Sequence, residues 1–296
     1  MHFVACVYPG PLESQVVLLC RSIRRFAGAH RDAPITVFAP LPVTVGNQLG
    51  EFGAELRPLL ERRPELPMAN KIFACAALEA ACEEDVIVFL DSDSVLVNEP
   101  TELELGAGHT VALRPVNRNS VASTGPGHPL EPFWAGVYEL CGVDPPPFVT
   151  AAVGGARIRS FWNSGIFAVR RSAGLMAAWR RHFLTLMNAR HVPPGGKINQ
   201  LEQVALAATL ARVPDEVLVL DGRYNFPLPL REDLDEPLRS ARLEDLVHVH
   251  YFRSFHEPDC VDRLEPGEIA KWLAPHLPLQ PVEYAREPRT AYRLPS

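Results

Sequence analysis

Residues Val86-Ile-Val-Phe-Leu90 run directly into Asp91-Ser92-Asp93-Ser94. Five consecutive apolar residues predict a strand that is buried on both faces, as in a parallel sheet. Two carboxylates, one residue apart, then follow where this strand ends, and ligands of open α/β sheets bind at that end. Carboxylate oxygens suit a divalent cation that also carries phosphate oxygens. A simple polar turn is the alternative interpretation.

The composition narrows the class of protein. The chain has 296 residues, of which 47% are hydrophobic and 22% charged, which is typical of a globular protein with a sizeable core. The formal net charge is −6 and no Lys/Arg block is present, so we expect no nucleic-acid binding. An acidic chain that binds an anionic ligand needs a local positive charge, and a metal ion would supply it.

The sequence carries no signal for export or membrane insertion. Residues Met1–Cys6 lack the basic flank and long apolar run of a signal peptide, and no segment has the apolar length of a membrane span. The six cysteines are scattered and form no CxxC pair. We therefore expect free thiols in a reducing compartment, and a cytoplasmic location.

Strand and helix patterns alternate through the first part of the chain, which predicts an α/β fold with a mostly parallel central sheet flanked by helices. Asn70 is expected to cap the second helix. The expected elements are strands at residues 2–8, 34–38, 54–59 and 86–90, and helices at about 12–26 and 70–81.

The second part of the chain is less regular. Residues 117–155 are rich in proline and glycine, which indicates either a binding loop or lid, or a surface insertion. The tail after Pro275 is rich in proline and arginine and is expected to lie on the surface. The expected elements here are strands at 110–113, 161–169 (interrupted at 163–165), 217–220 and 246–251, and helices at 133–140, 173–187 and 201–211.

Two histidines lie in the last predicted strand, within Leu246–Phe252. His248 and His250 are two residues apart and therefore share one face. An imidazole can join carboxylates around Mn²⁺ or a similar ion. We choose His250 as the ligand because it is nearer the strand end; His248 would lie behind it or in the core. A purely structural role is the alternative for both.

The segment Asn163-Ser164-Gly165 interrupts an apolar pattern between Trp162 and Ile166. Asn and Ser offer short hydrogen-bonding groups, and Gly165 allows a ligand to approach the backbone closely. Such departures from local propensity tend to occur at functional sites. A β-bulge or turn is the alternative.

Two predicted helices begin with polar residues of interest. Glu202 and Gln203 open the helix from Leu201, although an acid in the first turn is also favoured by the helix dipole. Lys71 follows Asn70, where a cation opposes the dipole. That cost is tolerable if Lys71 faces a phosphate or carboxylate; a solvent-facing lysine is the alternative.

Taken in order, these motifs resemble those of the GT-A fold glycosyltransferases, particularly the glycogenin-like and galactosyltransferase-like family 8. Asp91-Ser-Asp93 is similar to the DxD motif of that family, and Asn163-Ser164-Gly165 to its asparagine–small–glycine segment. Glu202-Gln203 is similar to its Asp-Gln pair, and Val249-His250-Tyr251 to its late apolar–His–aromatic segment. The resemblance covers about residues 1–255.

The resemblance implies a metal-dependent transfer of a sugar from a nucleoside diphosphate sugar, with UDP as the expected nucleotide, to a hydroxyl acceptor with retention of configuration. It implies a catalytic role for Asn163, Glu202 and Gln203. The implied ligands of Mn²⁺ or Mg²⁺ are Asp91, Asp93 and His250. The implied contacts of the nucleotide and donor are Tyr8, Lys71, Asp91, Ser92, Ser164, Gly165 and Arg253.

Two positions depart from the family pattern. The family often follows its histidine with a glycine and a lysine that reaches the diphosphate; here Arg253, or Lys71, would have to replace that lysine. Glu202 stands where the family has aspartate, which leaves the acceptor geometry open.

The resemblance also implies a domain division and a set of partners. Residues 1–260 would form the catalytic domain, with a nucleotide-binding half at about 1–116 and an acceptor half at about 117–260. Residues 261–296 would form a C-terminal helix and surface tail. The acceptor would be a saccharide, a lipid-linked molecule or a small molecule, and a homodimer is left open.

Two other functions fit the same pattern. A Mg²⁺-dependent nucleotidyltransferase would have a glycine-rich, basic loop after the first strand, whereas Tyr8-Pro-Gly-Pro-Leu-Glu13 holds no Lys or Arg. A non-catalytic module that binds nucleotide sugars is the second alternative.

Overall fold

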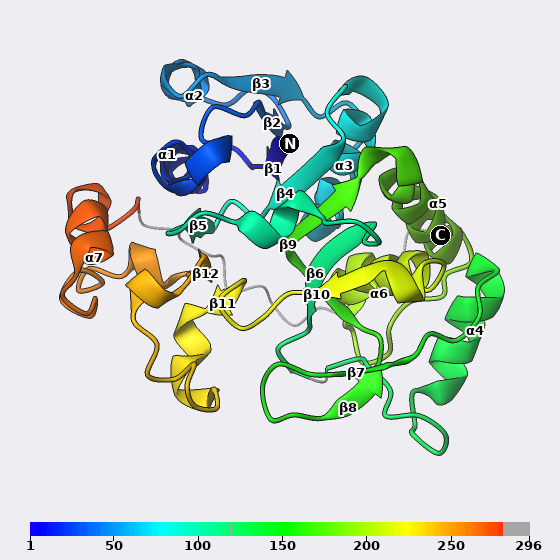
Figure 1. Ribbon diagram of the computed structural model, residues 1–296. Helices are drawn as coiled ribbons and strands as arrows, with labels where there is room; N and C mark the ends of the chain where they lie inside the picture. Colours follow the sequence, from blue (N-terminus) through cyan, green and yellow to red (C-terminus); the bar gives the residue numbers. More distant parts are fainter. Residues whose placement is uncertain (119, 281–296) are drawn as a thin grey trace.

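The computed structural model describes residues 1–118 and 120–280 (Figure 1). A seven-stranded sheet forms its centre, with the strand order β10-β6-β9-β4-β1-β2-β3. The predicted α/β class is confirmed. The strands are β1 (His2–Cys6), β2 (Ile35–Ala39), β3 (Ala54–Pro58), β4 (Val86–Leu90), β6 (Val111–Pro115), β9 (Trp162–Arg170) and β10 (Val217–Val219).

The sheet is mostly parallel, as predicted, with one exception that matters for function. β4, β1, β2 and β3 run parallel to one another, and β10 is parallel to β6. β9 lies between β4 and β6 and is antiparallel to both. Because its direction is reversed, the first residues of β9 lie beside the carboxyl end of β4, where Leu90 pairs with Ile166.

β9 is one continuous strand of nine residues, so the predicted interruption at 163–165 was wrong. The irregularity lies instead in its neighbour β6, where the register shifts between Leu113 and Pro115. Proline has no backbone N–H to donate to a ladder, which explains why the shift occurs there.

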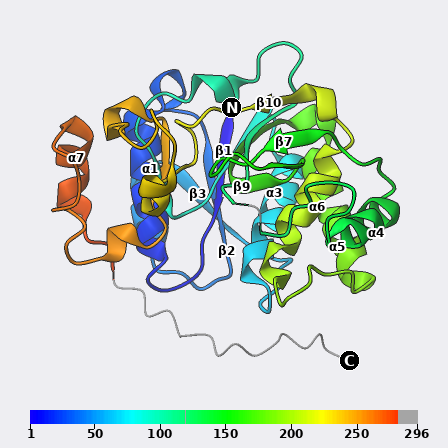
Figure 2. The same cartoon turned by 90° about the horizontal axis from the view of Figure 1, so that it is seen from below.

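Helices cover both faces of the sheet, as Figure 2 shows: α1 lies on one side, and α3, α5 and α6 lie on the other. Side chains of β4 alternate between the two layers, with Val88 packed on the α1 side and Phe89 on the α3 side. The strand is therefore buried on both faces, as predicted. The helices are α1 (Glu13–Phe26), α2 (Gly46–Glu51), α3 (Asn70–Ala81), α4 (Glu131–Cys141), α5 (Leu175–Asn188), α6 (Leu201–Leu210) and α7 (Glu268–Leu273).

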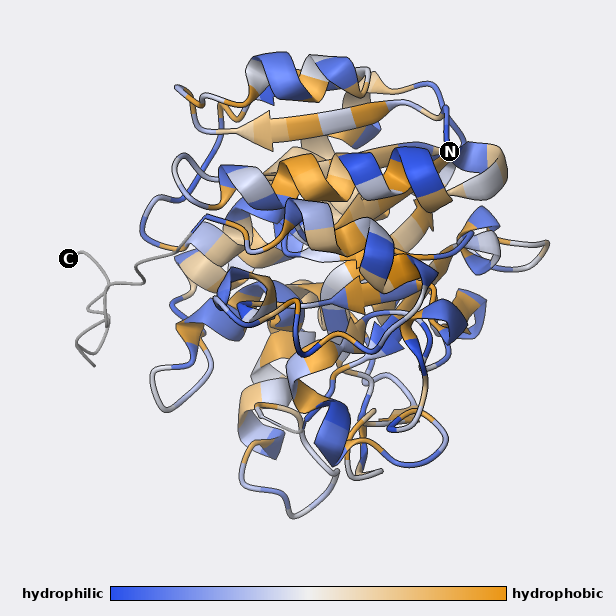
Figure 3. Cartoon of the chain, turned by 90° about the vertical axis from the view of Figure 1, so that its left-hand side faces the viewer, coloured by the Kyte–Doolittle hydropathy of each residue, from blue (hydrophilic) through white to orange (hydrophobic). Residues whose placement is uncertain are grey.

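The hydropathy of the residues follows this layering. In Figure 3 the strands are largely hydrophobic, whereas hydrophobic and hydrophilic residues alternate along the helices. Such an arrangement is what an amphipathic helix needs in order to bury its apolar stripe against a sheet.

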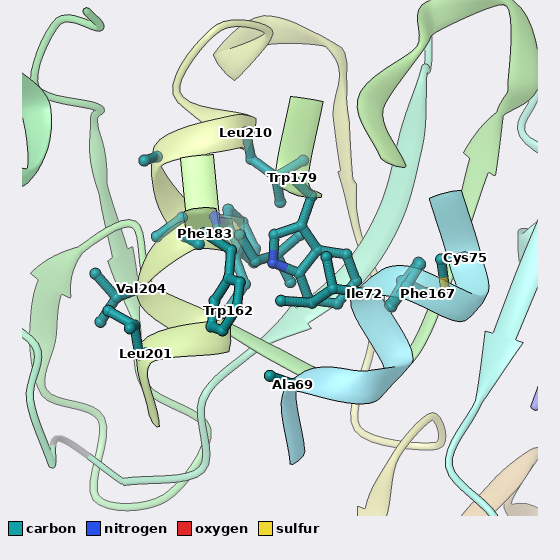
Figure 4. Close-up of a cluster of buried hydrophobic side chains, with 14 of the residues drawn as sticks. Ala69, Ile72, Cys75, Trp162, Phe167, Trp179, Phe183, Leu201, Val204 and Leu210 are labelled. Atoms are coloured by element: carbon teal, nitrogen blue, oxygen red, sulfur yellow. The ribbon is translucent and has the colours of Figure 1, made fainter. Parts of the chain in front are cut away.

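A tightly packed cluster joins α5 and α6 to β9 (Figure 4). The Trp179 ring of α5 meets Phe167 of β9 edge-on, with ring centroids 5.6 Å apart. Its indole N–H donates a hydrogen bond of 2.8 Å to the Glu202 carbonyl. This contact holds the first turn of α6 close to β9.

A three-stranded sheet, in the order β11-β12-β5, stands beside the large one. It consists of β5 (Ser94–Leu96), β11 (Phe226–Pro227) and β12 (His248–His250). β12 is antiparallel to β5, and His250 pairs with Ser94. The late histidine strand is thus held next to the residues that follow β4.

Part of the segment 117–155 is anchored in the main core. Trp134 of α4 is buried, and its indole N–H donates to the Val121 carbonyl. The segment also contributes β7 (Phe148–Thr150), which forms a hairpin with β8 (Arg157–Arg159).

The structure corrects the predicted helix cap and confirms the free thiols. Ala69, not Asn70, precedes α3, and the Asn70 side chain accepts a hydrogen bond from the Arg63 backbone instead. All six cysteines are free. Within the described residues, no helix is both long and apolar enough to cross a membrane. The predicted surface tail falls largely on residues 281–296, outside the described residues.

Candidate active site

The acidic pair lies at the carboxyl end of β4, against the start of β9. The Asp91 backbone N–H donates a hydrogen bond of 2.9 Å to the Gly165 carbonyl. This bond continues the β4–β9 ladder by one residue beyond Leu90. The segment Asn163-Ser164-Gly165 is therefore brought next to the acidic pair, although about 70 residues separate them in the sequence.

Asp91, Asp93 and His250 converge. Each offers one ligand atom, and these three atoms lie within 4.8 Å of one another. His250 Nε2 is 3.0 Å from Asp93 Oδ1, because the antiparallel pairing of β12 with β5 sets His250 opposite Ser94. Two carboxylates and an imidazole are a donor set that suits Mn²⁺ or Mg²⁺, so the residues present fit such an ion.

The two histidines of β12 have different surroundings. His248 is fully buried, and neither ring nitrogen has a hydrogen-bond partner among residues 1–118 and 120–280. Burial holds the pKa of His248 well below its usual range. His250 is the histidine that reaches the acidic pair.

Asp93 and His250 stabilise each other's charge. Burial alone would lower the pKa of His250, but the Asp93 carboxylate raises it above its ordinary value. Burial likewise opposes ionisation of Asp93, yet the His250 ring holds the pKa of Asp93 below its ordinary value. A proton, or a cation in its place, is therefore favoured between these two side chains.

Lys71 lies on the other side of Asp91. Its Nζ is 2.6 Å from Asp91 Oδ1 and 3.4 Å from both oxygens of Ser164. Burial alone would lower the pKa of Lys71, but the Asp91 and Glu202 carboxylates raise it above its ordinary value. Lys71 is thus a buried cation that faces a carboxylate.

Glu202 is buried behind Ser164. The Ser164 hydroxyl donates to Glu202 Oε1 at 2.8 Å, and Glu202 Oε2 has no hydrogen-bond partner in the described part of the chain. Burial raises the pKa of Glu202 to about 7, although the Lys71 charge acts against this shift. Burial therefore favours the protonated form of Glu202 more than in an exposed glutamate.

A cavity of about 380 Å³ opens beside the acidic pair. Among the predicted site residues, it is lined by Tyr8, Lys71, Asp91, Ser92, Asp93, His250 and Arg253. Of the described residues, Asn163, Ser164, Gly165, Glu202 and Gln203 are not part of this lining. Two larger cavities, of about 550 and 510 Å³, lie elsewhere and contain neither aspartate of the pair.

The remaining predicted residues lie in β9, in α6 and along the cavity. Asn163 Oδ1 accepts the Gly165 N–H at 2.7 Å, and Gln203 is half-buried in the first turn of α6. Tyr8 donates its hydroxyl to the Pro67 carbonyl at 2.8 Å. Arg253 is exposed at the cavity rim.

Several residues of the site were not predicted from the sequence. Asn225 Oδ1 lies 3.1 Å from His250 Nδ1, and the Phe252 ring stacks on His250 with centroids 3.9 Å apart. Gln15 accepts a hydrogen bond from the Ser92 hydroxyl at 3.1 Å. Asn225, at the end of the turn formed by residues 223–225, carried one signal in the sequence, because asparagine tolerates the positive φ that this position adopts.

Comparison with known proteins assigns the chain to a family. A family model described as the Rhodobacterales glycosyltransferase domain matches residues 3–213. A search of curated proteins found no match.

Two solved structures share the fold. The apo structure of the bifunctional glycosyltransferase WbbM has a TM-score of 0.52 at 12% identity, covering 94% of this chain and 51% of that one. An active-site mutant of LgtC has a TM-score of 0.50 at 15% identity, covering 94% of this chain and 96% of that one. The chain belongs to the Rhodobacterales glycosyltransferase domain family and is a glycosyltransferase of the GT-A fold.

Proposed function

We propose that this glycosyltransferase moves a sugar from a nucleoside diphosphate sugar, with UDP as the nucleotide, to a hydroxyl acceptor with retention of configuration, and that it requires Mn²⁺ or Mg²⁺. The observation that carries the proposal is the convergence of Asp91, Asp93 and His250 within 4.8 Å. This cluster borders a cavity at the carboxyl end of β4, where open α/β sheets bind their ligands.

The cation would be held by Asp91, Asp93 and His250. When bound, it would offset the negative charge that develops on the leaving diphosphate. The lining of the cavity supports this placement, because Lys71 and Arg253 add two positive charges beside the acidic pair. We propose that Arg253 contacts the diphosphate, since Lys71 is already engaged with Asp91.

Tyr8 and Ser92 support the nucleotide part of the proposal. Tyr8 lies in the cavity lining just beyond the end of β1, and its ring is held by the hydrogen bond to Pro67. We propose that the nucleotide base packs against this ring. Residues 6–93 and 250–253 supply all of the described cavity lining, which supports a nucleotide-binding half near residues 1–116.

The sugar and acceptor contacts are proposed for the side of the site that faces β9 and α6. Glu202 Oε2 is a buried acceptor without a described partner, and burying such a group is costly unless a ligand satisfies it. We propose that Glu202 acts on the donor sugar through Ser164, whose hydroxyl hydrogen bond it accepts, with Gly165 beside them. Asn163 and Gln203 are the proposed contacts nearest the transferred sugar.

The two alternative functions are less well supported. Membership of a glycosyltransferase domain family favours sugar transfer over nucleotidyl transfer and over mere binding.

A screen of nucleotide sugars tests the proposal. UDP-, GDP-, ADP- and CMP-sugars would be added with and without Mn²⁺, and the melting temperature recorded. We expect stabilisation by UDP-sugars that depends on Mn²⁺, together with Mn²⁺-dependent hydrolysis of the stabilising donor when no acceptor is present.

Two variants sharpen this test. Asp93→Asn should abolish the effect of Mn²⁺, whereas Asp215→Asn, an exposed aspartate away from the cavity, should leave it unchanged. Equal stabilisation with and without the metal, or an undiminished effect in Asp93→Asn, would refute the metal assignment.

A further inference from the structure

Both ring nitrogens of His250 face oxygen atoms. Nδ1 is 3.1 Å from Asn225 Oδ1, and Nε2 is 3.0 Å from Asp93 Oδ1. We infer that Asn225 is a positioning residue: it accepts the Nδ1–H of His250 and so directs the Nε2 lone pair toward the divalent cation. This inference rests on the proposed metal site and extends it by one residue.

The proton positions follow from the chemistry of the partners. An amide oxygen carries no hydrogen, so His250 must donate from Nδ1 to Asn225. In the neutral ring, Nε2 is then a bare acceptor that faces Asp93 Oδ1, which is also an acceptor. Two acceptors at 3.0 Å repel each other unless a proton or a metal ion lies between them. Ligating histidines commonly donate their other N–H to a fixed acceptor in this manner.

The backbone around Asn225 is held from the large sheet. Arg114 of β6 is buried, and its Nη1 donates to the carbonyls of Tyr224 at 2.7 Å and Asn225 at 3.4 Å. Asn225 itself is 1% exposed and has a φ of 47°, a conformation that asparagine tolerates better than most residues. A buried guanidinium is costly unless it is hydrogen-bonded, so this contact fixes the turn firmly.

Gly165 leaves the space that the amide and the ring occupy. A Cβ atom at position 165 would lie 2.8 Å from Asn225 Oδ1 and 2.9 Å from His250 Nδ1. On the ring itself, Phe252 stacks with an interplanar angle of 5°. The imidazole is thus held by the Asn225 amide at its edge and by Phe252 on its face, which leaves Nε2 one direction in which to point.

The test separates the acceptor from the fold. Asn225→Gly removes the amide but suits a positive φ, so it should fold. Asn225→Asp keeps an oxygen acceptor at the same place. Asn188→Gly, at the exposed end of α5, controls for the substitution itself. Mn²⁺ affinity is measured by titration calorimetry, and the His250 tautomer by ¹⁵N NMR of histidine-labelled protein at alkaline pH without metal.

We expect Asn225→Gly to weaken Mn²⁺ binding by about tenfold or more and to lose the pure Nδ1–H tautomer of His250. Asn225→Asp should restore both properties, and Asn188→Gly should match the wild type. Wild-type affinity together with an unchanged tautomer in Asn225→Gly would overturn the inference.

The same experiments distinguish failure of the inference from failure of the proposed function. If the wild type binds no Mn²⁺, or if Asp93→Asn binds Mn²⁺ equally well, the metal site itself is refuted. If the wild type binds Mn²⁺ and Asn225→Gly binds it equally well, the metal site stands and only the role of Asn225 falls.

Discussion

Lys71 Nζ lies 2.6 Å from Asp91 Oδ1, and the side chains are 5% and 18% exposed. The pair joins the first turn of α3 to the end of β4, and it answers a question that the sequence left open. A lysine at a helix N-terminus opposes the dipole, but here the Asp91 carboxylate offsets that cost. The same lysine supplies positive charge to an acidic protein at the place where an anionic ligand is proposed to bind.

Removing the lysine should destabilise the fold. Lys71→Met leaves Asp91 largely buried without its partner, and breaking a buried ion pair from one side typically costs about 3 kcal/mol or more. Urea unfolding measures the loss. Lys271→Met is the matched control because its pair with Glu268, at 2.7 Å, is exposed and should contribute nothing measurable. Equal stability of the two variants would show that Lys71 is not a structural partner of Asp91.

Glu202 should make stability depend on pH. Its pKa of about 7 in the folded protein lies above the ordinary value of 4.5, so folding favours the protonated carboxyl. This contribution is fully present below pH 4.5 and is lost as the pH rises through about 7. The total is about 3 kcal/mol. Glu202→Gln keeps a partner for Ser164 and should flatten the decline between pH 5 and 8 in chemical unfolding; parallel profiles of the two proteins would contradict the assignment.

His248 should be dispensable for the metal and unfavourable for the fold. Its two ring nitrogens are buried without described partners, which costs free energy. The free energy of unfolding of His248→Leu should therefore equal that of the wild type or exceed it by about 1 kcal/mol. The variant should bind Mn²⁺ as the wild type does. Loss of Mn²⁺ binding in this variant would mean that the wrong histidine has been assigned.

The pH dependence of His248 has the opposite sign to that of Glu202. Its lowered pKa means that the unfolded chain takes up a proton first, so stability should fall as the pH drops below 6.5. His248→Leu should reduce this acid destabilisation, which unfolding curves at pH 5 and 7 would reveal.

A methyl group at position 165 should disturb the metal site. In Gly165→Ala the new Cβ would meet Asn225 Oδ1 at 2.8 Å and His250 Nδ1 at 2.9 Å, and overpacking of this kind costs about 1–3 kcal/mol. Melting temperature and Mn²⁺ affinity should both fall. Gly50→Ala, where nothing lies within 4 Å of the added Cβ, should lose neither; an unaffected Mn²⁺ affinity in Gly165→Ala would show that the site can accommodate the methyl group.

The sequence predicted the elements that carry the acidic pair because their signals are local. The five apolar residues Val86–Leu90 indicate a buried strand whatever its neighbours in the sheet are. The helical spacing of apolar residues after Lys71 can likewise be recognised without knowing any distant contact. The predicted cap at Asn70 was wrong because its side chain bonds to Arg63, seven residues earlier. That contact depends on the path of the intervening loop, which local propensity does not encode.

The sequence by itself determined that this chain forms an α/β sheet with two carboxylates at a strand end, because burial and side-chain alternation are properties of a few neighbouring residues. The tertiary structure decided which distant residues complete the site. The reversed direction of β9 places Gly165 beside Asp91, and the pairing of β12 with β5 brings His250 to Asp93 across 157 residues. Strand order and direction follow from the packing of the whole sheet. The roles of Asn225 and Arg114 could therefore be recognised only in the tertiary structure.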